Sequence, residues 1–81
     1  FELDYSRKDE IIYINNCKSS KNYYFEVWNS KSDLLYSTEM NLLAGINFFI
    51  YPGSTKDDRF LKIVVKDKNV ICHEEKLISS I

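Results

Sequence analysis

Short stretches of alternating residues, separated by polar turns, are the feature that most limits the fold of this chain. In residues 23–28, Tyr23, Phe25 and Val27 occupy every second position. Successive side chains of a β-strand point to opposite faces, so these three side chains share one face of a strand. The same alternation returns in residues 60–66. The pattern therefore predicts a chain built from short strands.

The same criteria place the other strands and the turns between them. The predicted strands are residues 1–6, 11–14, 23–28, 34–38 with an apolar continuation at 41–43, 46–51, 60–66 and 70–78. Pro52-Gly53 is expected to end the strand before it, because proline lacks the N–H that a sheet needs. A polar loop is predicted at 54–58 and a hairpin at Asp67-Lys68-Asn69.

Residue usage supports strands over helices. Val, Ile, Thr, Tyr, Phe and Trp account for 27 residues, whereas alanine occurs once. Branched and aromatic side chains pack well on a pleated surface and lose rotamer freedom in a helix. Met40 and Leu43 offer the nearest approach to a helical pattern, and that segment is too short to stand alone.

Seven short strands with turns every eight to twelve residues are typical of an all-β, antiparallel β-sandwich of the immunoglobulin or fibronectin-III type. No repeat or linker divides the chain, so residues 1–81 are predicted to form one domain. The start at Phe1 without Met favours a domain excised from a longer protein. The predicted core lies between two sheets, with Glu26, Asn47 and Lys62 facing water. Its residues are Phe25, Val27, Phe48, Ile50, Ile63 and Val65.

One segment carries a resemblance to a known family. The stretch YYFEVWNSKSDLLYSTEMNLLAGINFFIYP, about 30 of the 81 residues, resembles the middle of small bacterial immunoglobulin-like or fibronectin-III-like modules. Such modules are accessory domains beside surface-polysaccharide enzymes, on secreted enzymes and in cell-surface proteins. The resemblance implies the architecture and a non-catalytic role, and it leaves a cell-surface, secreted or cytoplasmic location open.

The two cysteines test the immunoglobulin comparison. Cys17, Trp28 and Cys72 have a spacing similar to the Cys, Trp, Cys core of immunoglobulin domains. However, Cys17 lies in a segment typical of a turn, and Val70 stands where that family has a tyrosine. A disulfide between Cys17 and Cys72 remains an alternative, and two unpaired thiols are the preferred interpretation.

Catalysis and metal binding are unsupported by any motif. His73 is the only histidine, and on a strand its neighbours Cys72 and Glu74 point to the opposite face. A dyad of His73 with Cys17 across the sheet would lack an oxyanion-forming loop. No CxxC, HxxxH or Asp-rich calcium loop occurs, and glycines only at 45 and 53 exclude nucleotide-binding glycine motifs. We predict a non-enzyme without metal or cofactor.

The balance of charge limits the classes of partner that this chain is expected to bind. Eleven basic and twelve acidic residues give a net charge of −1. Without a basic stripe, nucleic acid is an unfavourable partner. Lys18, Lys21 and Lys31 are diluted by polar residues, and the acidic pairs at 57–58 and 74–75 are interpreted as solvated turns. No apolar run approaches the roughly 18 residues of a membrane helix, so no membrane insertion is expected.

Binding of a partner by the protein surface is the remaining class of function. Tyr24, Glu26 and Trp28 form an aromatic, acidic, aromatic face along one strand, with the rings about 13 Å apart. Such a platform could stack on sugars or anchor a protein. The alternative is that Trp28 is a core tryptophan. We therefore expect a non-catalytic accessory or interaction module, with a carbohydrate-binding module as the alternative. The expected partner is a neighbouring domain or a second copy, met through an aromatic patch or through the end strands.

Overall fold

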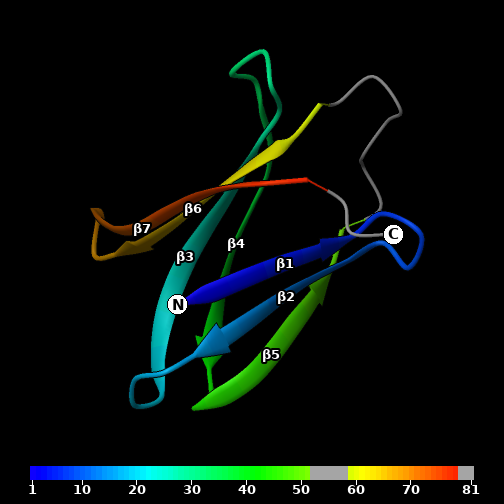
Figure 1. Cartoon of the computed structure of the whole chain (residues 1–81). Coiled ribbons are helices and arrows are strands. Elements are labelled where there is room, and N and C mark those ends of the chain that lie inside the picture. Colours follow the sequence, from blue (N-terminus) through cyan, green and yellow to red (C-terminus); the bar gives the residue numbers. More distant parts are fainter. Residues whose placement is uncertain (52–58, 79–81) are drawn as a thin grey trace.

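The computed structural model describes residues 1–51 and 59–78, and these contain strands and no helix. None of the described segments is a helix long and apolar enough to cross a membrane. The strands, in chain order, are β1 (Glu2–Ser6), β2 (Ile11–Asn16), β3 (Lys21–Trp28), β4 (Leu34–Leu42), β5 (Gly45–Ile50), β6 (Leu61–Asp67) and β7 (Val70–Leu77) (Figure 1).

The strands form two antiparallel sheets. One sheet has the order β1-β2-β5, and the other has the order β4-β3-β6-β7. Buried side chains from both sheets belong to one hydrophobic cluster, so the two sheets pack as the layers of a sandwich. The prediction of an all-β antiparallel sandwich is confirmed.

The core follows the alternation along the central strands. Four of the six predicted core residues, Phe25, Val27, Ile63 and Val65, are fully buried, and for these the prediction is confirmed. Register explains this, because Phe25 pairs with Val65 and Val27 pairs with Ile63 across β3 and β6. The other buried members of the cluster are Tyr5, Ile12, Ile14, Tyr23, Leu42, Tyr51, Leu61 and Leu77.

For β5 the predicted face is wrong. Phe48 and Ile50 are 58% and 64% exposed, whereas Phe49 packs against the core. The cause is the register with β2, in which the buried Ile12 lies opposite Phe49. Residues directly opposite each other share a face of the sheet, so Phe49 points inward and its neighbours point outward.

Asn47, predicted to face water, instead lies on the half-buried inner face of β5, opposite Ile14. Its side-chain oxygen accepts a hydrogen bond from the Leu43 N–H at 3.0 Å, and its amide nitrogen donates to the Leu43 and Gly45 carbonyls at 2.8 and 3.2 Å. A polar group that makes these bonds can occupy this position at little cost. Asn47 thus ties β5 to the end of β4.

The turns and strand ends can be compared with those predicted from the sequence. The predicted strand at 34–38 and its continuation at 41–43 become one strand, β4, and the helical turn considered there does not form. Gly45 starts β5 with a φ of 96°, a conformation that favours glycine. The expected hairpin joins β6 to β7, with Lys68 and Asn69 at φ values of 50° and 69°. Two positive φ values in a two-residue loop are the signature of a type I′ turn. The predicted turn at Pro52-Gly53 and the loop at 54–58, with Asp57 and Asp58, lie outside the described residues.

Candidate functional site

Tyr24, Glu26 and Trp28 lie on the outer face of the four-stranded sheet. Their alternate neighbours on β3 are buried, so the pleat directs these three side chains away from the core. Tyr24 is 37% exposed, and Trp28 is partly buried rather than part of the core cluster. The alternative of a core tryptophan at Trp28 is therefore wrong.

The surroundings of Trp28 occupy both its polar atom and part of its ring. Its indole Nε1 donates a hydrogen bond to Glu26 Oε1 at 3.2 Å. The Lys62 ammonium lies 5.9 Å from the ring centroid, a cation–π distance. Lys66 Nζ lies 3.0 Å from the second oxygen of Glu26. These contacts reduce the ring surface that Trp28 can offer to a sugar.

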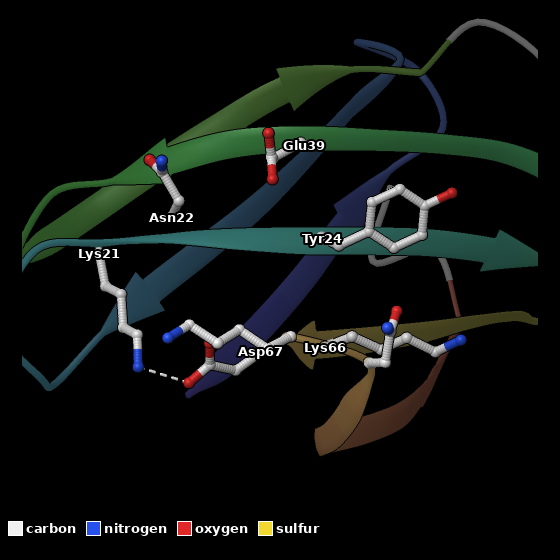
Figure 2. A pocket seen from close by; sticks show the side chains of 8 residues that line it. Lys21, Asn22, Tyr24, Glu39, Lys66 and Asp67 are labelled. Atoms are coloured by element: carbon white, nitrogen blue, oxygen red, sulfur yellow. Dashed lines mark hydrogen bonds and ion pairs between the residues drawn. The ribbon is translucent and has the colours of Figure 1, made fainter.

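Tyr24 lines a shallow hollow of about 500 Å³ on the same face (Figure 2). Figure 2 shows Glu39 on the strand next to Tyr24, and Lys21 turned toward Asp67 at the end of the hollow. Lys21 and Asp67 form an ion pair, and this hydrogen-bonded carboxylate raises the pKa of Lys21 above its ordinary value of 10.5. The complete lining is Lys21, Asn22, Tyr24, Glu39, Lys66, Asp67, Lys68 and Asn69.

The charges around this hollow largely compensate one another. Lys21 is paired with Asp67, and Lys66 is paired with Glu26. Paired, exposed charges exert little long-range attraction at physiological salt. The arrangement can offer hydrogen bonds and one tyrosine ring to a neutral polar ligand, and it offers little to a strongly charged one.

A second surface, on the other sheet, was missed by the sequence prediction. Ile46, Phe48 and Ile50 on β5 are 78%, 58% and 64% exposed, and we call them the β5 row. Ile11 and Tyr13 of β2 lie opposite Ile50 and Phe48 and extend the row across the sheet. The alternation in residues 46–51 places three apolar side chains on this side and an asparagine on the other, so the sequence favours the wrong side as the core.

The acidic residues Glu2 and Asp4 of β1 border this surface. With Tyr13 and Ile46 they line a shallow hollow of about 380 Å³, together with Leu3 and Asn15. An apolar centre with a polar rim is the usual composition of a protein-binding surface.

Cys17 and Cys72 are both exposed and carry free thiols, so the structure contains no disulfide between them. Cys72 is the extra residue of an irregularity in the β6–β7 pairing, where Val65 pairs with His73 and Lys66 pairs with Ile71. Its thiol donates to the Val65 carbonyl at 3.4 Å. Cys72 thus has a local structural role in the bulge.

His73 and Glu74 point to opposite faces of β7. His73 lies opposite the core residue Val65, and its Nε2 is 2.9 Å from Glu75 Oε1. Glu74 instead pairs with Lys62 at 3.2 Å on the outer face. Within the described residues no three His, Cys, Asp or Glu side chains gather as a metal site.

No protein-family model, no curated protein and no solved structure matches this chain in the comparisons made. Its functional assignment therefore depends on the surfaces described above.

Proposed function

We propose that this chain is a non-catalytic interaction module of a larger bacterial protein, which packs on a protein partner through the outer face of its three-stranded sheet. The observation that carries the proposal is the exposed β5 row, Ile46, Phe48 and Ile50, on one side of one strand. Contiguous exposed apolar side chains with a polar rim are typical of protein-binding surfaces.

The order of the strands supports a fibronectin-III-like module over an immunoglobulin constant-type one. In the constant-type domain the fourth strand joins the sheet of the first, second and fifth strands. Here β4 pairs with β3 in the opposite sheet. The resemblance of residues 23–52 to small bacterial modules supports the same choice, and such modules are usually accessory domains.

The balance of charge supports contact through apolar area. A net charge of −1 gives weak steering of a charged ligand, and β5 itself carries no ionisable side chain. Affinity for a partner should then depend on a few apolar anchors, with Phe48 as the aromatic one.

Site-specific photo-crosslinking in the source cells tests the proposal. A benzophenone amino acid at position 48 should form adducts with a protein, whereas the same amino acid at position 70 should not. Val70 is the matched control, because it is an apolar strand residue, 66% exposed, on β7 of the other sheet. Absence of protein adducts at position 48, or equal adducts at both positions, would contradict the proposal.

A carbohydrate-binding role is the second candidate, and one observation favours it. Tyr24 shares its hollow with Asn22 and Glu39, which combine an aromatic ring with hydrogen-bonding groups suited to sugar hydroxyls. Trp28 is the only tryptophan, so its fluorescence reports ligands on this face. Titration with a panel of oligosaccharides should give a saturable change that Tyr24→Ala abolishes and Tyr13→Ala preserves. No saturable change with any sugar would exclude this role for the sugars tried.

A further inference from the structure

β5 is the terminal strand of its sheet. It pairs with β2 on one side, and no described strand pairs with its other side (Figure 1). An edge strand presents unpaired backbone N–H and C=O groups, which are a template for another strand.

β5 also lacks the protection that the other three edge strands have. Natural edge strands usually carry charged side chains, which oppose pairing with another chain. β1 carries Glu2 and Asp4, β4 carries Glu39, and β7 carries Glu74 and Glu75. The β5 sequence, GINFFI, has no charge at all.

We propose that β5 pairs antiparallel with β5 of a second copy, about a twofold axis at Phe48. This inference goes beyond the proposed function, because the second copy pairs with the edge of β5 and leaves the outer face of the sheet open to a protein partner. In this register Phe48 lies opposite the second copy's Phe48, Ile46 lies opposite its Ile50, and Ile50 lies opposite its Ile46. All three pairs lie on the outer face, since residues directly opposite share a face. The β5 rows of the two copies then form one continuous apolar surface.

Charge is compatible with a second copy as the occupant. The nearest strand with acidic side chains on this outer face is β1, two positions from β5. In the paired sheet the β1 strands of the two copies lie roughly 24 Å apart, at about 4.8 Å per strand. That distance exceeds the Debye length of about 8 Å at physiological salt, so the acidic residues repel each other little.

The inner face of β5 packs against its own copy. Tyr36 of β4 contacts β5 from the core side, where its ring stacks on Phe49 with the ring centroids 6.2 Å apart. Among the described strands each copy has one uncharged edge, so a twofold pair uses both of these edges and leaves the charged ones outside. Pairing is therefore expected to close at a dimer.

Sedimentation equilibrium of the purified chain tests the pairing. The wild-type chain should be a dimer that dissociates on dilution, and Phe48→Lys should weaken it by about tenfold or more, because like charges would lie directly opposite each other. Val70→Lys adds the same charge on β7 and should leave the dimer unchanged. A wild-type monomer at every concentration, or a dimer that Phe48→Lys does not weaken, would overturn the inference.

Cysteine crosslinking tests the register in a Cys17→Ser, Cys72→Ser background. Directly opposite residues have Cα atoms about 4.5–5.5 Å apart, within the range of a disulfide. Phe48→Cys should therefore oxidise to a covalent dimer. Ile46→Cys alone should not, but it should crosslink when mixed with Ile50→Cys. A dimer that crosslinks through two copies of Ile46→Cys would overturn the proposed axis.

These results separate the inference from the proposed function. If the purified chain is a monomer while position 48 crosslinks a different protein in cells, the second copy is wrong and the interaction module stands. If position 48 crosslinks nothing in cells, the proposed function fails as well.

Discussion

The indole of Trp28 is held by Glu26, whose Oε1 accepts its Nε1–H at 3.2 Å from two positions earlier on the same strand. Lys66 of β6 lies 3.0 Å from the other oxygen of that carboxylate. Glu26 therefore fixes the tryptophan ring and links β3 to β6 on the outer face of the four-stranded sheet.

Removal of the carboxylate should release the ring. In Glu26→Ala we expect tryptophan fluorescence to shift to longer wavelength and to be quenched more strongly by acrylamide. The loss of unfolding free energy should stay near 1 kcal/mol, because partly exposed ion pairs contribute little. Glu39→Ala, on the neighbouring strand, is the control and should leave the emission unchanged. An unaltered emission spectrum in Glu26→Ala would contradict this assignment.

Two adjacent phenylalanines on β5 should differ in their contribution to stability. Phe49 packs against the core and contacts Phe25 with ring centroids 5.9 Å apart, whereas Phe48 is exposed. Phe49→Ala should cost about 2 kcal/mol or more, and Phe48→Ala should cost less than about 1 kcal/mol in urea unfolding of dilute protein. Equal losses, or the reverse order, would show that the face of β5 is misassigned.

The face of β5 shows where sequence alone falls short. Its alternate positions place Ile46, Phe48 and Ile50 on one side and Asn47 and Phe49 on the other, so hydrophobicity favours the wrong side as the core. The register with β2 decides the face, and this long-range pairing leaves no trace in the local pattern. The hydrogen bonds of Asn47 to the end of β4 make its inward position acceptable.

For β3 and β6 the pattern predicted the core face correctly. Phe25 lies between Tyr24 and Glu26, and Val65 lies between Val64 and Lys66, so one charged neighbour of each favours the opposite face as the outer one. The outward position of Tyr24, Glu26 and Trp28 follows from the same alternation. The contacts of Trp28 with Lys62, and the hollow beside Tyr24, depend on neighbouring strands, and the sequence could not predict them.

The β6–β7 hairpin should accept a stabilising change. Lys68 and Asn69 adopt positive φ values, which Asn and Gly tolerate better than Lys and Asn at these positions of a type I′ turn. The double variant Lys68→Asn, Asn69→Gly should raise the unfolding free energy by about 1 kcal/mol, because relief of the strain at positive φ exceeds the entropy that glycine adds to the unfolded chain. Asn69→Val should lower the unfolding free energy, because a β-branched residue disfavours positive φ. A destabilised Asn-Gly variant would contradict the turn assignment.

The ion pair of Lys21 predicts a pH dependence at the alkaline end. Asp67 raises the folded-state pKa of Lys21 above 10.5, so the pair's contribution is fully present below that value and is lost as pH rises through the folded pKa. An NMR titration of Lys21 should show the raised pKa, and Asp67→Asn should return it toward 10.5. Glu39→Gln is the control and should leave it unchanged. A Lys21 pKa insensitive to Asp67→Asn would contradict the pairing.

The outward face of β5 underlies both proposals, and methyl NMR with a soluble paramagnetic agent tests it most directly. In dilute protein, the methyl signals of the exposed Ile46 and Ile50 should broaden strongly, while those of the fully buried Ile12, Ile14 and Ile63 should remain sharp. Protection of Ile46 and Ile50 equal to that of the core isoleucines would contradict the exposed β5 row and the function proposed from it.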